Sequence, residues 1–208
     1  MSVSTQRRLG ELGRLVSGRT WLPMVRLEAL YYGCLAVEEQ GIAGDVVECG
    51  TDRGGSAALM ALAAPTRHLW IFDSFEGLPE PGLEDTEEAW EYVGHDATPV
   101  QEVVAFFAEV GLAGRYTLIP GWYEQTMPEC SGAVERIAVL HLDCDWYASV
   151  KLCLEHLWDR VVPGGYIQID DYGRWAGCRL AVDEFLSRQC PSAALHAIDY
   201  TARALSKP

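Results

Sequence analysis

The sequence has 208 residues, of which 49% are hydrophobic and 22% are charged, which is ordinary for a single globular domain. Its formal net charge of −14 repels phosphate backbones and anionic lipids, so neither nucleic acid nor a membrane is expected as a partner. The chain shows no signal-peptide core, no apolar run of membrane-spanning length and no paired spacing among its seven cysteines, and we expect a cytoplasmic protein with reduced thiols and no zinc site.

Apolar patterns predict the order of helices and strands. Residues that recur at three- and four-residue spacing indicate helices, and short apolar runs that end at glycine or aspartate indicate buried strands. Pro163, Gly164 and Gly165 are expected to stop the helix that precedes them. In chain order the pattern predicts a helical region over 1–44 with a helix at 23–40, strand 45–50, helix 56–64, strand 68–75, a loop or lid over 76–97, helix 98–111, strands 116–121 and 136–145, helix 149–162, strand 166–173, helix 177–189, and two closing strands over 195–200 and 202–206.

This alternation of strands and helices predicts one α/β domain over residues 1–208. Near-continuous apolar strands are typical of a parallel sheet with helices on both faces, and right-handed crossovers make such a sheet doubly wound. The two closing strands have no helix between them, which predicts an antiparallel edge. Ligands of such sheets bind at the carboxyl ends of the strands, so the residues that end each strand are the candidates for function.

The end of the first strand has the features of a cofactor site. Gly50 closes the strand, and Gly54 and Gly55 open the next helix, where glycines let the backbone approach a ligand. The turn lacks the G-x-G-x-x-G pattern of dinucleotide sites, and a carboxylate at Glu48 suits the sulfonium and ammonium groups of S-adenosylmethionine better than a pyrophosphate. Asp73, at the end of the second strand, stands where an acid commonly binds ribose hydroxyls. Either acid could instead cap a loop.

Two pairs of aspartates follow the fourth and fifth strands. Asp143 and Asp145 lie on the same side of one strand, and Asp170 and Asp171 occupy the turn after the other. Carboxylates at such close quarters need protons or a cation to offset their repulsion. An all-oxygen set selects a hard cation, Mg²⁺ first, with Mn²⁺ or Ca²⁺ as further candidates. The alternative is that each pair caps a helix or a surface turn.

Four segments then occur in a set order: ECG…RGGS over 48–56, DSFEGLP over 73–79, LDCDWYAS over 142–149, and PGG…DDY over 163–172. Together they resemble the macrocin O-methyltransferase family, which methylates sugar hydroxyls in antibiotic biosynthesis. The resemblance implies a class I methyltransferase fold, a seven-stranded sheet with an antiparallel last strand, and S-adenosylmethionine as cofactor.

The resemblance also implies roles for individual residues. The metal ligands fall on Asp143, Asp170 and Asp171, and the catalytic base on Asp145, with the division of roles between Asp143 and Asp145 left open. The cofactor-binding residues expected at this rim are Glu48, Gly50, Gly54, Gly55, Ser56, Asp73, Ser74, Trp122 and Asp143.

Departures from the family pattern concern the acceptor. Cys144 replaces a common glycine, and the region before the first strand is short. In the family this region and the lid help to form the substrate pocket and the oligomer, so a homo-oligomer is expected. The acceptor implied is a small molecule with a hydroxyl, such as a glycosylated natural product.

Three other interpretations compete with this one. A catechol-type O-methyltransferase would share the fold, the cofactor and the metal but would hold a planar phenol. A non-catalytic protein that binds S-adenosylmethionine or a nucleotide would have no use for the four aspartates. A nicotinamide-dependent oxidoreductase is disfavoured because the G-x-G-x-x-G pattern is missing.

Overall fold

A seven-stranded sheet organises the fold in the computed structural model, which describes residues 3–208. The strand order is β3-β2-β1-β4-β5-β7-β6, and the first five of these strands run parallel. β7 runs antiparallel to β5, so the predicted doubly wound sheet with an antiparallel last strand is confirmed. The strands are β1 Asp45–Cys49, β2 Leu69–Asp73, β3 Tyr116–Pro120, β4 Ile137–Leu142, β5 Val161–Ile169, β6 His196–Ala197 and β7 Arg203–Ser206.

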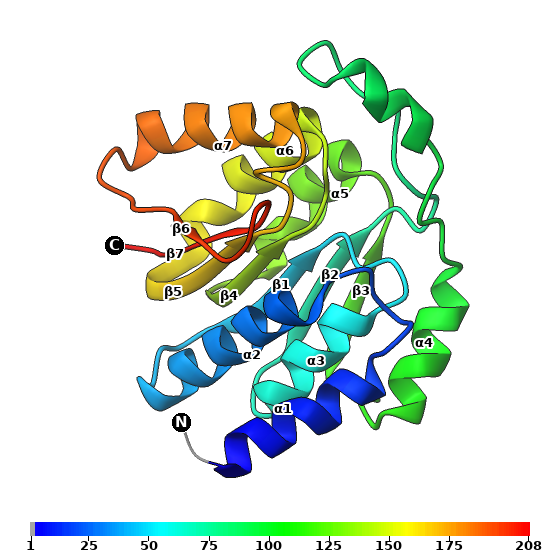
Figure 1. The fold of residues 1–208 in the computed structure, drawn as a ribbon, viewed down its shortest axis with the longest axis vertical. Helices are drawn as coiled ribbons and strands as arrows, with labels where there is room; N and C mark the ends of the chain where they lie inside the picture. The colour runs from blue at the N-terminus through cyan, green and yellow to red at the C-terminus, as the bar shows by residue number, and fades with distance from the viewer. Residues whose placement is uncertain (1–2) are drawn as a thin grey trace.

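Helices cover both faces of this sheet, and each helix predicted from the sequence is present. Figure 1 shows α1, α2 and α3 on one face and α5, α6 and α7 on the other. Within residues 3–208, no helix is long and apolar enough to cross a bilayer. The helices are α1 Val3–Leu15, α2 Met24–Glu39, α3 Gly55–Ala63, α4 Val100–Glu109, α5 Tyr123–Cys130, α6 Tyr147–Leu157 and α7 Ala176–Gln189, with short 3₁₀ turns η1 Glu87–Tyr92, η2 Ser131–Ala133 and η3 Trp158–Arg160.

Two apolar cores lie on opposite faces of the sheet, because neighbouring residues of a strand point to opposite faces. In β1, Val47 joins the core under α6 and α7, whereas Val46 joins the core under α2 and α3. In β4, Leu140 and Val139 divide in the same way. Every residue of β4 is buried, which explains why its sequence is apolar except for His141. This packing fixes the carboxyl ends of β1 and β4 side by side.

The start of β5 differs from the prediction. The strand begins at Val161 rather than at residue 166, so Pro163–Gly165 lies inside the strand and does not stop the preceding helix. The pairing with β4 shifts register here, which marks a bulge. Gly164 N–H donates to the Lys207 carbonyl (2.7 Å), and Lys207 N–H donates to the Gly165 carbonyl (2.9 Å). The bulge therefore exchanges backbone hydrogen bonds with the end of the chain, which the local sequence did not indicate.

Helix α5 was not predicted. Its sequence, YEQTMPEC, is short and polar, contains Pro128, and buries only Thr126 and Met127. Two buried residues are too few to produce a recognisable helical period. The helix begins directly after Trp122 at the end of β3, so it places that side chain at the rim of the sheet.

The predicted lid, residues 76–97, extends past the carboxyl ends of the strands (Figure 1). We expected no regular element in it, but it contains the turn η1, in which Ala89 is fully buried while its acidic neighbours face solvent. Leu78 N–H donates to the His95 carbonyl, and Gly94 N–H donates to the Leu78 carbonyl, each at 2.9 Å. Hydrogen bonds from the start of α6 help to attach the segment to the rest of the fold: Trp146 Nε1 donates to the Pro79 carbonyl, and Tyr147 N–H donates to Asp85 Oδ1.

Candidate active site

A cavity of about 410 Å³ opens at the carboxyl ends of β1, β2, β4 and β5, where the fold class predicts a ligand. The four predicted aspartates, Asp143, Asp145, Asp170 and Asp171, all line it. So do the predicted cofactor residues Gly50, Ser56, Asp73, Ser74 and Trp122. The structure therefore brings residues from the ends of all five parallel strands into one space.

Three predicted cofactor residues do not line the cavity. Glu48 is fully buried, and Thr51 Oγ1 donates to its Oε2 (2.6 Å) while His141 Nδ1 lies 2.9 Å from its Oε1. Gly54 precedes α3 with a left-handed backbone, and Gly55 N–H donates to the carbonyl of Arg19. Glu48 therefore shapes the turn from behind the cavity wall, and contact between these residues and a cofactor stays a prediction.

Gly50 marks the closest approach of two strand ends. Its φ is 85°, and a Cβ built on it would lie 1.8 Å from the carbonyl oxygen of Asp143. Only glycine fits here, and the contact holds the turn after β1 against Asp143, one of the candidate metal ligands.

Replacing Gly50 with alanine is therefore expected to lower the free energy of unfolding by about 2–4 kcal/mol, because the backbone of Asp143 must move. Gly111 is the matched control: its φ is also positive, at 77°, but a Cβ there meets nothing within 4 Å. Gly111→Ala should cost only about 1 kcal/mol, from its left-handed backbone alone. Chemical denaturation measures both, and equal losses would contradict the close-approach explanation.

Asp73 is held firmly at the rim of the cavity. Thr51 N–H donates to its Oδ2 (2.6 Å), and Phe75 N–H donates to its Oδ1 (2.7 Å). Burial raises the pKa of Asp73, while these backbone bonds act in the opposite direction. A carboxylate accepts about four hydrogen bonds, so Asp73 keeps capacity for hydroxyl groups of a ligand.

Asp143, Asp170 and Asp171 form a group in which one carboxylate oxygen from each lies within 4.8 Å of the others. Burial and the neighbouring carboxylates raise the pKa of both Asp143 and Asp171 well above its usual range. A cation would relieve this repulsion, and three oxygen donors suit Mg²⁺ or Mn²⁺. The residues present therefore fit the divalent metal that the family resemblance implies.

Asp145 stands apart from this triad. Its backbone has a φ of 55°, a left-handed conformation that aspartate tolerates better than most residues. Trp175 Nε1 donates to its Oδ1 at 2.8 Å, which fixes the side chain in the cavity. Burial raises the pKa of Asp145 to about 7, although the bond from Trp175 lowers it. Asp145 can therefore exchange a proton near neutral pH.

Several cavity residues were missed by sequence reasoning. Arg174 stacks 4.0 Å above the Trp175 ring and pairs with Glu88 of the lid, and Trp21 Nε1 donates to Asp96 at the other end of the lid. Trp175 lies three residues after the DDY segment, which was an available signal. Nothing in the pattern around Trp21 pointed to the cavity.

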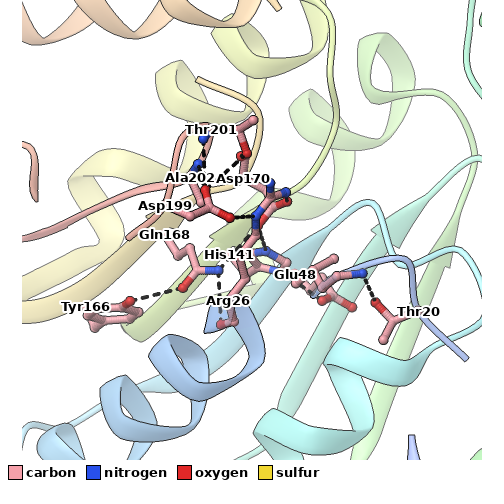
Figure 2. A network of polar contacts seen from close by, with 11 residues as sticks. Thr20, Arg26, Glu48, His141, Tyr166, Gln168, Asp170, Asp199, Thr201 and Ala202 are labelled. Atoms are coloured by element: carbon pink, nitrogen blue, oxygen red, sulfur yellow. Dashed lines mark hydrogen bonds and ion pairs between the residues drawn. The ribbon is translucent and has the colours of Figure 1, made fainter. Parts of the chain in front are cut away.

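A buried polar network borders the cavity, and Arg26 and Asp170 both line it (Figure 2). Arg26, in the first turn of α2, lies between Asp170 and Asp199, and His141 lies between Asp170 and Glu48. Burial opposes charge on His141, but Asp170 and Glu48 together raise its pKa to about 9. His141 is fully buried within this network. The sequence did not indicate that Arg26 contacts Asp170 and Asp199, because a lone arginine on a helix belongs to no motif.

A family profile described as Macrocin-O-methyltransferase (TylF) matches residues 3–207. The chain belongs to this family. It is an O-methyltransferase with S-adenosylmethionine as methyl donor, as its motifs predicted, and the nicotinamide-dependent and non-catalytic alternatives are excluded.

Named relatives of this family member support the assignment. The 8-demethyl-8-(2,3-dimethoxy-alpha-L-rhamnosyl)-tetracenomycin-C 4'-O-methyltransferase of Streptomyces olivaceus is 38% identical over 193 residues, which are 88% of this chain and 73% of that protein. Mycinamicin III 3''-O-methyltransferase of Micromonospora griseorubida is 34% identical over 182 residues, with 81% and 70% covered. The structure of the O-methyltransferase NovP superposes with a TM-score of 0.82 at 29% identity, covering 91% of this chain and 82% of that one.

Proposed function

We propose that this family member is a metal-dependent O-methyltransferase whose acceptor is a hydroxyl of a sugar on a natural product. The observation that carries the proposal is the triad of Asp143, Asp170 and Asp171 in the same cavity as a separate Asp145, whose side chain Trp175 holds in place. Methyl transfer to an alcohol needs a site that takes up the hydroxyl proton while the methyl leaves sulfur. This arrangement provides both the charge and the base for that task.

The donor end of the cavity suits S-adenosylmethionine. Asp73 would accept hydrogen bonds from the ribose hydroxyls, and Ser56, in the first turn of α3, would receive the carboxylate at the helix N-terminus. Trp122, at the end of β3, would pack against the adenine ring. Ser56, Asp73 and Trp122 lie at or just after the ends of β1, β2 and β3, so the sulfonium would point toward the aspartates that follow β4 and β5.

The acceptor end is built from the aspartates. A divalent cation held by Asp143, Asp170 and Asp171 would stabilise negative charge on the acceptor oxygen. Asp145, oriented by Trp175, would accept the hydroxyl proton as general base. The lid and the segment with Trp21 border the same cavity and would exclude water during transfer.

Two observations support a sugar acceptor. First, two relatives are named for methylation of a rhamnosyl tetracenomycin and of mycinamicin III. Second, two adjacent sugar hydroxyls could both face a metal that three aspartates hold from one side. The net charge of −14 disfavours anionic acceptors. A neutral or cationic glycosylated molecule meets both conditions.

A screen with radiolabelled S-adenosylmethionine tests this proposal. It would compare glycosylated natural products with simple sugars, catechols and RNA, each with Mg²⁺ and with a chelator. Label on the sugar of a glycosylated compound, in the presence of Mg²⁺ only, is the expected result. Transfer to catechols alone would move the acceptor class to phenols, and transfer to RNA would overturn the acceptor proposal.

A further inference from the structure

We propose that Arg26 and Asp199 are positioning residues for Asp170, so that the hairpin before β7 forms an outer part of the metal site. This inference rests on the proposed function, because it concerns the metal that Asp170 would hold. Neither Arg26 nor Asp199 belongs to a motif of the sequence. They lie far apart along the chain and meet only in the folded structure (Figure 2).

Arg26 connects two carboxylates with one rigid group. Its Nη1 lies 2.5 Å from Asp170 Oδ2, and its Nε lies 2.7 Å from Asp199 Oδ2. The guanidinium is planar, so fixing one edge on Asp199 also fixes the direction in which the other edge meets Asp170. The Arg26 side chain is 10% exposed and that of Asp170 is 3% exposed, so water offers Asp170 little alternative to this contact.

Asp199 is itself held by the backbone of the hairpin. Thr201 N–H and Ala202 N–H both donate to its Oδ1 at 2.8 Å, which leaves Oδ2 for Arg26. Thr201 Oγ1 donates to the backbone carbonyl of Asp170 at 3.0 Å. The hairpin therefore contacts Asp170 by two routes. Thr201 bonds to the main chain of Asp170, and Asp199 acts on the side chain of Asp170 through Arg26.

The opposite oxygen of Asp170 is also surrounded. Gln168 Nε2 lies 3.4 Å and His141 Nε2 lies 3.8 Å from Asp170 Oδ1. Donors thus face both oxygens of Asp170, and the carboxylate has little freedom to rotate. Groups that orient a metal ligand in this way typically contribute 10- to 100-fold to metal affinity.

A second ion pair of α2 serves as a control, because it anchors the helix without contacting Asp170. Arg67 pairs with Glu38 near the other end of α2, and its side chain is 10% exposed, as that of Arg26 is. That pair joins α2 to the turn after α3 and touches none of the three metal-candidate aspartates. Loss of either pair should destabilise the fold, but only loss of the Arg26 pair should change metal binding.

The test is direct Mn²⁺ binding, measured by electron paramagnetic resonance without cofactor or acceptor, to the intact protein and its variants. Asp199→Asn is expected to weaken Mn²⁺ binding at least about tenfold. Arg26→Lys, which keeps the charge but cannot bridge both carboxylates, should do the same and serves if Asp199→Asn folds poorly. Glu38→Gln should leave Mn²⁺ affinity unchanged. Activity of Asp199→Asn should recover at saturating Mn²⁺, because Asp145 and the cofactor residues are intact.

The outcomes separate the two proposals. If the wild type binds Mn²⁺ and both Asp199→Asn and Arg26→Lys bind it equally well, the positioning role is wrong while the proposed function stands. Equal weakening by Glu38→Gln would also overturn it, since general loosening of α2 would then be the cause. If the wild type binds no Mn²⁺, the metal part of the proposed function fails, and the positioning role fails with it.

Discussion

Asp145→Asn is expected to lower the rate of methyl transfer about a thousandfold, because general-base catalysis contributes about 10²–10⁴-fold. Asparagine keeps the size of the side chain, and its carbonyl can still accept the bond from Trp175 Nε1. It cannot take up the proton of the acceptor hydroxyl. Binding of S-adenosylmethionine should change little, since Ser56, Asp73 and Trp122, which would hold it, lie near the ends of β1, β2 and β3 rather than β4.

Single-turnover rates at saturating donor and acceptor measure this loss, and calorimetry measures donor affinity. Asp96→Asn is the matched control, because Asp96 lines the same cavity but bonds only to Trp21 among the hydrogen bonds found in residues 3–208. It should stay within a few-fold of wild type. A near-normal rate for Asp145→Asn would remove Asp145 from the base role and turn attention to Asp143, the other candidate.

Removal of the metal is expected to reduce turnover by a comparable or larger factor. A strong chelator should abolish methyl transfer, and added Mg²⁺ should restore it, because the triad would lose the charge that stabilises the acceptor oxygen. Asp171→Asn should need a higher Mg²⁺ concentration for half-maximal rate. Asp171 is the suitable member of the triad to change, because it is only half-buried and, among the ion pairs found in residues 3–208, forms none with Arg26.

Titrating the rate with Mg²⁺ gives the half-maximal concentration for each variant. Asp183→Asn supplies the control, because Asp183 lies on α7, accepts a bond from Tyr172 and is not a member of the triad. Undiminished turnover in the presence of the chelator would show that the aspartates act without a metal. A loss of donor affinity in Asp171→Asn would show instead that this carboxylate belongs to the cofactor site.

The residues that end the strands could be predicted because two regular patterns determine them. Each buried strand is a run of apolar residues, and the polar residue that follows marks where the run leaves the core, as at Asp73, Asp143 and Asp170. Parallel strands then bring these residues to one edge of the sheet. The cavity therefore contains the predicted aspartates.

What could not be predicted depends on contacts between distant segments. The bulge at Pro163–Gly165 needs Lys207 as its backbone partner, and the direction of Glu48 depends on Thr51 and His141. Arg26 meets Asp199 only after the hairpin has docked. A single sequence carries local patterns, and pairings of this kind leave no local pattern.

The strand order also bears on how the protein is made. β1 pairs with β2 on one edge, but its other edge pairs with β4, which the ribosome adds much later. Until then the central strand of the nascent chain presents a free apolar edge at Val46 and Val47, and such edges recruit strands from other chains. The long-range pairing also slows folding, since the intervening chain must be closed into a loop first. Chaperone protection during synthesis should therefore matter most in the interval between the emergence of β1 and that of β4.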